Sequence, residues 1–437
     1  MVYMYSLDLV IRSSFLHFIE DPSKCSNKLS SYEFLNDGLM IIKKGRIIEL
    51  REYSDEDEKR FENIEDKRGY LVVPGFIDTH IHYPQTEMIG SYGEQLLEWL
   101  ETYTFPTEQK FSDIDYARKI SKVFIRELLK NGTTSALVFG TVHTESVEAL
   151  FEEALNENML LISGKVMMDR NAPDYLLDTA DKSYIESEAL INKWHSRKRL
   201  KYAITPRFAP TSTREQLTLA GKLKEKYPDV YVHTHLCENR NEIEWVKELY
   251  PERKSYFNVY DYYGLSGDKS VFAHSIHLTD DEWDDISKTN SVISFCPTSN
   301  LFLGSGLFKL SKAEEKNIRV GLGTDIGAGT SFCQLDTLNE AYKVNLLEGN
   351  KLSALKGFFL ATLGGAIALS IDDKVGSFTE GKVADFVVID WAVNDLQELR
   401  VNNSNDLEDK LFSLMIMGGQ QNIKETYIAG KRKYCLD

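Results

Sequence analysis

The sequence predicts an α/β protein in which a (β/α)8 TIM-like barrel, residues 74–373, is joined to a β-sandwich domain built from residues 1–73 and 374–437. Two observations predict this fold class. Eight short apolar segments between residues 71 and 327 alternate with amphipathic helical patterns, as expected for βα units in series. The two ends of the chain are rich in strand and turn patterns and resemble each other more than the middle, so we expect them to fold together.

The N-terminal segment is expected to be mainly β-structure. Residues 39–50, LMIIKKGRIIEL, have the pattern of a strand, a Lys-Gly turn and a second strand. The charged stretch that follows, residues 54–68, is expected to form a solvated loop or a short helix without a functional role.

The middle of the chain supplies the eight predicted barrel strands. They are YLVVPGFIDTHIH (70–82), TTSALVFG (133–140), LLISGKVMMD (160–169), KYAITPRFAP (201–210), VYVHTHLCE (230–238), SVFAHSIHL (270–278), SVISFCPTSN (291–300) and RVGLGTDIG (319–327). Helical patterns lie between them, for example at 117–132, 146–158 and 214–227. After the last strand, residues 355–369 are expected to form a buried helix, and 375–391 and 423–434 return to strand and turn patterns.

Composition limits the possible partners and compartments. The 437 residues are 42% hydrophobic and carry a net charge of −16, so we expect a folded protein that binds neither nucleic acid nor anionic membranes. The sequence has no apolar run of 18 residues and no signal-peptide pattern. The five cysteines are odd in number and far apart, which favours reduced thiols and a cytoplasmic location.

Residues suited to metal binding and proton transfer stand at the carboxyl ends of predicted strands, where barrels build their sites. His80 and His82 form an H-x-H pair, and residues two apart on a strand direct both imidazoles to the same side. The intervals from His82 to His235, to His274 and to Asp325 are 153, 39 and 51 residues in turn. They correspond to about four, one and two βα units. The residues are His80 and His82, His235 and Glu238, His274, and Asp325.

Three imidazoles and a carboxylate form a donor set suited to Zn²⁺, which lowers the pKa of a bound water to roughly 7. Glu238 is placed to carry protons between water and substrate, and Asp325 to bind the metal and hold the attacking water. A single histidine at a strand end is usually structural, so the predicted metal site depends on the combination of the H-x-H pair with the histidines and Asp325 at the ends of other strands. His233, deeper on its strand, is expected to pack in the barrel core.

Several of these segments resemble the amidohydrolase superfamily: PGFIDTHIH, HLCEN, FAHSIHL and GLGTDIG. A narrower resemblance, to the guanine deaminase family, covers roughly residues 70–375 and the ends more loosely. It is carried by LLEWLETYTFP (96–106), KNGTTSALVFGTVHT (130–144), TPRF (205–208), HLCENRNEIEWVKELYP (235–251), CPTSNLFLGSG (296–306) and ATLGGAIAL (361–369).

The resemblance implies hydrolytic deamination of guanine to xanthine and ammonia, with one zinc ion per chain and a homodimeric assembly. It implies that zinc is bound by His80, His82, His235 and Asp325, and that the catalytic groups are Glu238, His274 and Asp325. It also implies that the base is contacted by Gln85 at the purine edge, Arg207 at the carbonyl, Phe208 in the ring pocket and Trp99 in a closing loop, together with His235, Glu238 and Asp325.

Other interpretations stay open at this point. A related mononuclear aminohydrolase or chlorohydrolase would act on another purine, a nucleoside, a pyrimidine base or a triazine. A non-catalytic scaffold would keep the barrel without the metal, and a structural metal site would have no free carboxylate beside it. A second metal bridged by a carbamylated lysine is unsupported, because Lys201 starts its strand and Lys165 lies within another.

Overall fold

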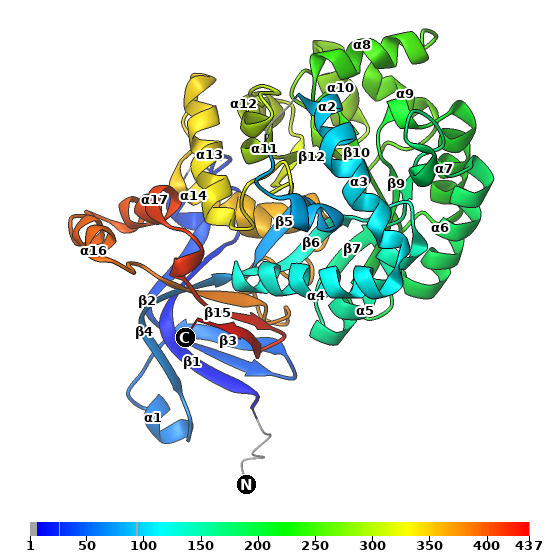
Figure 1. Cartoon of the computed structure of the whole chain (residues 1–437). Helices are drawn as coiled ribbons and strands as arrows, with labels where there is room; N and C mark the ends of the chain where they lie inside the picture. Colours follow the sequence, from blue (N-terminus) through cyan, green and yellow to red (C-terminus); the bar gives the residue numbers. More distant parts are fainter. Residues whose placement is uncertain (1–6, 26, 93–94, 437) are drawn as a thin grey trace.

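A parallel β-barrel surrounded by helices occupies the middle of the chain, and a mixed sheet from both ends lies beside it (Figure 1). The computed structural model describes residues 7–25, 27–92 and 95–436. These features confirm the predicted α/β fold class, a (β/α)8 TIM-like barrel joined to a β-domain from both ends of the chain; among the described residues that domain is one mixed sheet, where the sequence predicted a β-sandwich. The boundaries at residues 73 and 374 stay a proposal.

Within the described residues, eight successive parallel strands form the nearly closed barrel. The Asp325 amide donates to the His80 carbonyl at 2.9 Å and the His82 amide to the Ile326 carbonyl at 3.1 Å, which draws the two ends of the sheet together. A short strand, β8 (Val166–Met167), pairs with β9. The barrel strands are β5 (Phe76–His82), β6 (Thr133–Phe139), β7 (Leu160–Gly164), β9 (Leu200–Pro206), β10 (Tyr231–Leu236), β11 (Ser270–His274), β12 (Val292–Phe295) and β13 (Arg319–Leu322).

The helices around the barrel follow the apolar spacing of the sequence. In α4 the buried side chains of Ala117, Phe124 and Leu128 lie on one face, and the Asp113 carboxylate caps the first turn. The helices are α4 (Ile114–Lys130), α5 (Thr144–Glu157), α6 (Ala180–Trp194), α7 (Arg214–Lys226), α8 (Arg240–Leu249), α9 (Tyr256–Tyr262), α10 (Asp280–Lys288), α11 (Pro297–Phe302), α12 (Leu310–Glu315) and α13 (Gln334–Leu347).

The terminal segments form one mixed sheet, which among the described residues has seven strands in the order β16-β15-β14-β4-β1-β2-β3. The turn predicted between residues 39 and 50 is confirmed, with positive φ at Lys44 and Gly45. The charged stretch holds the short helix α1 (Asp57–Arg60). The strands are β1 (Leu9–Phe18), β2 (Tyr32–Lys43), β3 (Arg46–Glu52), β4 (Glu65–Pro74), β14 (Phe386–Asp390), β15 (Ile423–Ile428) and β16 (Lys431–Cys435).

The continuous strand predicted over residues 70–82 is wrong, because the chain changes sheets at Gly75. Strand β4 pairs with β1 and β14, whereas β5 pairs with β6 in the barrel. The Gly75 amide donates to the Asp385 carbonyl at 3.0 Å, and a Cβ there would overlap the Thr134 side chain. Only glycine fits this crossing, which sends His80 and His82 into the barrel.

A buried helical segment follows the barrel, as predicted for residues 355–369, and it fills the amino-terminal end of the barrel. It comprises α14 (Ala354–Phe359), the π-helical turn η7 (Leu360–Gly364) and α15 (Gly365–Ala368). Ala366 and Leu369 pack against interior barrel residues such as Ile77, and the Tyr231 hydroxyl donates to the Leu369 carbonyl at 2.7 Å. With this end filled, the carboxyl end of the barrel remains available for a site.

The remaining elements are short or peripheral. Helices α16 (Asp395–Asn402) and α17 (Leu407–Met417), which the sequence did not suggest, connect β14 to β15. In the part of the chain that the structure describes, no helix has the length and apolarity needed to cross a membrane. The 3₁₀ turns are η1 (Lys28–Ser30), η2 (Tyr83–Met88), η4 (Gln109–Ser112), η5 (Asp174–Leu176), η6 (Ala209–Thr211) and η8 (Gln420–Asn422).

Replacing Gly164 by alanine is expected to destabilise the barrel by about 3 kcal/mol or more, because a Cβ at this buried strand end would overlap the Ala203 carbonyl of the next strand. Gly349→Ala is the matched control, since its Cβ would meet open space and only its φ of 77° opposes the change, at about 1 kcal/mol. Urea unfolding of both variants measures the difference. Equal losses of stability would contradict the close approach of these two strands.

Candidate active site

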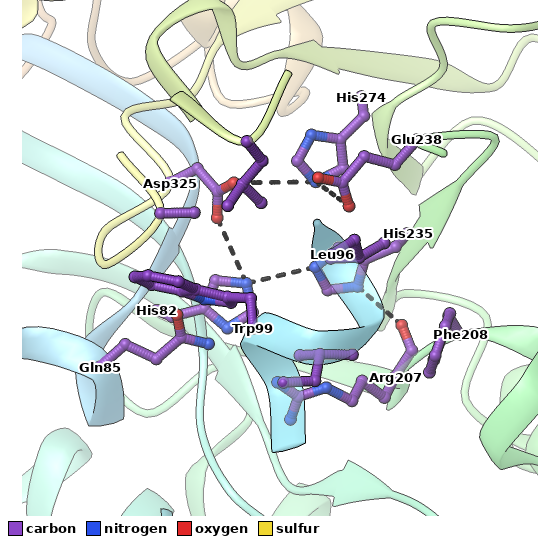
Figure 2. Close-up of a pocket in the computed structure, with 13 residues that line it drawn as sticks. His82, Gln85, Leu96, Trp99, Arg207, Phe208, His235, Glu238, His274 and Asp325 are labelled. Atoms are coloured by element: carbon purple, nitrogen blue, oxygen red, sulfur yellow. Dashed lines mark hydrogen bonds and ion pairs between the residues drawn. The ribbon is translucent and has the colours of Figure 1, made fainter. Parts of the chain in front are cut away.

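A cavity opens at the carboxyl end of the barrel. It brings together nearly all of the side chains that the sequence singled out (Figure 2). In this view Glu238, His274 and Asp325 lie at the top, and Gln85 and Arg207 lie at the bottom. Residues from strands far apart in sequence therefore share one site: His82, Gln85, Trp99, Arg207, Phe208, His235, Glu238, His274 and Asp325.

The histidines and Asp325 form a cluster at one end of this cavity. The Asp325 Oδ1 atom lies 3.2 Å from His80 Nε2 and 3.4 Å from His82 Nε2. His82 Nε2 lies 3.2 Å from His235 Nε2, and His274 Nε2 lies 3.8 Å from Asp325 Oδ2. Ligand atoms of His80, His235 and His274 lie within 4.8 Å of one another, as do those of His80, Cys296 and Asp325.

The outward-facing ring nitrogens set the tautomers of this cluster. His235 Nδ1 donates to the Arg207 carbonyl at 2.7 Å, and His274 Nδ1 donates to Asn300 Oδ1 at 2.9 Å. The Nε2 atom of the His235 ring, which burial keeps neutral, then carries a lone pair directed into the cluster, and the His274 ring is turned so that its Nε2 atom faces the same cluster. His80 Nδ1 lies 2.7 Å from His233 Nε2, which is a suitable partner for the same arrangement.

The chemistry of the cluster fits a divalent metal ion. Burial lowers the pKa of His80, His82 and His235 well below the usual value, so these imidazoles are neutral and able to act as ligands. Among the described residues, His80 Nε2 is buried without a hydrogen-bond partner, and a cation would satisfy it. The buried His, Cys and Asp groups are consistent with a metal site.

Local backbone structure holds the cluster in place. The Asp78 carboxylate accepts from the amides of His80 at 3.1 Å and Thr324 at 3.2 Å, so one side chain braces both β5 and the loop that carries Asp325. Asp325 and His274 adopt left-handed φ values of 52° and 68°. Such conformations cost of order 1–3 kcal/mol and are concentrated at functional sites, where the surrounding structure imposes them.

Glu238 follows β10 and points into the cavity beside His274. Its Oε2 lies 3.4 Å from His274 Nε2, and its Oε1 accepts from the Ser305 hydroxyl at 3.4 Å. The Glu242 carboxylate, which belongs to the capping box of α8, accepts from the Glu238 amide at 2.9 Å and fixes the backbone. Burial, followed by the nearby Asp325 charge, raises the pKa of Glu238 well above its usual value, as suits a group that exchanges protons near neutral pH.

Polar side chains at the other end of the cavity have fixed orientations. Gln85, on η2, accepts from the Gly327 amide at 3.2 Å. Arg207, directly after β9, is 2% exposed and donates from Nη1 to Glu108 at 2.8 Å. Their remaining N–H groups and lone pairs are able to contact the edge of a planar ligand.

The segment that carries Trp99 lies in the connection after the first barrel strand and covers the cavity as a run of helical turns. It consists of α2 (Leu96–Trp99), the π-helical turn η3 (Leu100–Thr104) and α3 (Phe105–Glu108). We call residues 96–108 the cover segment. Trp99 is buried and packs against Tyr103 and Phe302, with ring centroids 5.0 and 5.8 Å away. The apolar walls of the cavity are formed by Leu96, Trp99, Leu100 and Phe208.

Sequence reasoning missed several buried partners of the site. Cys296 and Asn300 lie in the motif CPTSNLFLGSG (296–306), but the sequence assigned no role to either residue, and Glu108 lies two residues beyond the motif LLEWLETYTFP (96–106). His233 packs in the barrel core as expected, and it also contacts His80. Lys165, which the sequence placed within a strand, is paired with Asp178 and Glu186 outside the cluster.

Comparison with known proteins gives consistent results. Residues 71–433 match the Amidohydrolase family. Guanine deaminase of Escherichia coli (strain K12) is 56% identical over 426 residues, covering 97% of both chains. The solved structure of E. coli guanine deaminase has a TM-score of 0.96 and 55% identity, covering 98% of this chain and 100% of that one.

A second solved structure holds a ligand. It is guanine deaminase from C. acetobutylicum with guanine bound in the active site, at 33% identity and a TM-score of 0.88, covering 98% of this chain and 100% of that one. The identities and the coverage are high enough to establish the family. This chain belongs to the amidohydrolase family and, within it, to the guanine deaminases.

Proposed function

We propose that this protein catalyses the zinc-dependent hydrolytic deamination of guanine, which yields xanthine and ammonia. The observation that carries the proposal is a single cavity with a buried His/Asp cluster and Glu238 at one end and Gln85 and Arg207 at the other. A purine base is planar and has polar edges, so it suits a cavity with apolar walls and fixed polar groups at its ends. The reaction belongs to purine catabolism and salvage.

One zinc ion per chain is proposed, held by His80, His82, His235 and Asp325. The neutral imidazoles and the carboxylate of this set are ligands that zinc prefers. When bound, zinc acts as a Lewis acid and lowers the pKa of a coordinated water to about 7. His274, held by Asn300, is placed to orient the attacking water or the substrate.

Glu238 moves the protons in the proposed mechanism. It takes a proton from the water as the water oxygen bonds to C2 of guanine, and it gives that proton to the adjacent ring nitrogen. The tetrahedral carbon then carries both a hydroxyl and the amino group. Glu238 transfers the hydroxyl proton to the amino nitrogen. The bond between C2 and this amino nitrogen then breaks, ammonia leaves, and xanthine remains. The contact of Glu238 with His274, at 3.4 Å, keeps its carboxyl group directed to this end of the cavity.

The base is proposed to bind between apolar walls with its polar edge on two side chains. Arg207 donates to the guanine carbonyl oxygen, and the Gln85 amide contacts the purine edge. Phe208 lines the ring pocket and Trp99 covers it. His235, Glu238 and Asp325 contact the reacting end of the substrate.

We also propose a cytoplasmic homodimer. All five cysteines are free, which supports a reducing compartment. Sedimentation at equilibrium tests the assembly, and a monomer mass would contradict it.

The decisive test is ammonia release by the purified, zinc-loaded protein, with guanine beside adenine, guanosine, cytosine and 8-oxoguanine. We expect fast release from guanine, with xanthine as the product. Release from another base alone would keep the hydrolase chemistry and overturn the assigned roles of Gln85 and Arg207. No release from any base, with one zinc bound per chain, would favour a chlorohydrolase.

A further inference from the structure

Glu108, the last residue of the cover segment, is a buried carboxylate without an assigned role in the reaction. Its side chain is fully buried, and it accepts from Arg207 Nη1 at 2.8 Å. We propose that Glu108 is a positioning residue that aims Arg207, and through a weaker contact Gln85, at the edge of the base. This inference rests on the proposed function, because it assumes that Arg207 binds the guanine carbonyl.

The guanidinium group of Arg207 needs a fixed partner at this depth. A buried positive charge is unfavourable unless an opposite charge and hydrogen bonds compensate it. Glu108 supplies the opposite charge and a hydrogen bond. This bond uses one of the five N–H groups of the Arg207 guanidinium, so other N–H groups can contact a ligand. The Phe105 ring, also on the cover segment, lies 5.6 Å from the guanidinium carbon and restricts it further.

Gln85 is held by the same carboxylate from the other side. Its Nε2 donates to Glu108 Oε1 at 3.5 Å, a long bond, while its Oε1 accepts from the Gly327 amide at 3.2 Å. These two contacts decide which end of the amide is the donor and which is the acceptor. Each end keeps a free N–H or lone pair, so the amide presents a defined pattern to the purine edge.

The position of Glu108 connects the cover segment to the part of the site that recognises the base. Arg207 also holds a proposed zinc ligand, because its backbone carbonyl accepts from His235 Nδ1 at 2.7 Å. Glu108 contacts the side chain of Arg207 and not this carbonyl, so its loss would disturb recognition of the base more than the metal cluster. Substrate affinity and selectivity are therefore expected to change, and zinc content and the chemical step much less.

Replacing Glu108 by glutamine keeps the shape and removes the charge. We expect KM for guanine to rise about 10- to 100-fold in E108Q, as for loss of a hydrogen bond between charged groups, with kcat changed by less than about threefold. Selectivity for guanine over 2-aminopurine, which lacks the carbonyl oxygen, is expected to fall by a similar factor. The conservative variant E108D, shorter by one methylene, is expected to restore part of the selectivity.

A double-mutant cycle tests whether Glu108 acts through Arg207. In an R207Q background, E108Q is expected to change KM and selectivity by no more than about twofold, because the main group that Glu108 positions is gone and only its weaker contact with Gln85 remains. Additive losses would overturn the proposal, and so would wild-type KM and selectivity in E108Q alone. Glu425→Gln is the matched control, since this buried glutamate pairs with Lys67 and Arg432 at 2.8 and 2.9 Å in the terminal sheet, far from the cavity.

The outcomes separate this inference from the proposed function. A wild-type protein that releases no ammonia from guanine would contradict the function itself. An R207Q variant with wild-type KM would contradict the recognition role of Arg207 and overturn the inference with it. Thermal unfolding and zinc content of each variant show whether the fold is retained. If E108Q does not fold, E108D with wild-type selectivity overturns the inference, and E108D with reduced selectivity supports it.

Discussion

Replacement of Glu238 by glutamine is expected to lower kcat for guanine by about 10²–10⁴-fold, the range expected when a general acid–base is lost. KM and zinc content are expected to stay close to those of the wild type. Glutamine has nearly the same shape and is able to keep the contact with Ser305, but it neither accepts nor releases a proton at neutral pH. Steady-state kinetics and metal analysis of the purified variant make the measurement.

The structure explains why a single residue would carry so large an effect. Glu238 is 2% exposed, so bulk water has little access to the proton path through its carboxyl group. Burial raises its pKa, which favours the protonated form more than in an exposed glutamate. His274 and Asp325 lie beside it, but these two groups are proposed to hold the water and the metal. Neither is proposed to transfer protons in place of Glu238.

A matched variant separates proton transfer from folding. Glu282 is also a buried glutamate in a neighbouring βα unit, and its carboxylate caps α10 by accepting from the Thr279 amide at 2.9 Å. Glu282→Gln is expected to reduce stability by about 1 kcal/mol and leave kcat within about twofold. If E238Q instead turned over guanine at a near-normal rate, the proton-shuttle role would be wrong.

The main features of the site follow from the order of residues along the chain. In a barrel the carboxyl ends of all strands meet at one face, so a histidine or carboxylate at a predicted strand end is placed in space by that fact alone. For this reason His80, Glu238 and Asp325 could be grouped from the sequence, and in the structure Glu238 and Asp325 line one cavity while His80 lies against Asp325. Their roles still await the variants described above.

Partners that reach the site from other elements could not be predicted in this way. Glu108 lies in a helical turn whose position depends on the packing of Trp99 over the cavity. The position of the Asn300 side chain depends on where α11 begins. The change of sheet at Gly75 was missed for a related reason. The apolar pattern continues across residues 70–82, and only the close approach of Thr134 shows that the chain must turn there.

Replacement of Asp325 by asparagine is expected to lower kcat by at least about 10²–10⁴-fold and, in contrast to E238Q, to weaken zinc binding as well. The carboxylate lies 3.2 Å from His80 Nε2 and 3.4 Å from His82 Nε2, and it is the charged member of the proposed ligand set. Asparagine removes that charge and the oxygen proposed to hold the attacking water. Zinc retained after dialysis against a chelator, measured beside the rate, tests both effects.

The two effects of D325N are separable because one depends on zinc concentration and the other does not. Excess zinc is expected to refill the site but not to restore the rate, since asparagine does not hold and polarise water as a carboxylate does. Asp336→Asn is the control, because this aspartate, in the first turn of α13, accepts from Ser331 at 2.6 Å and lies outside the cavity. Normal zinc retention and a normal rate in D325N would remove Asp325 from both roles. A rate fully restored by excess zinc would leave it as a ligand alone, and the positioning of the attacking water would then fall to His274 and Glu238, which lie 3.4 Å apart.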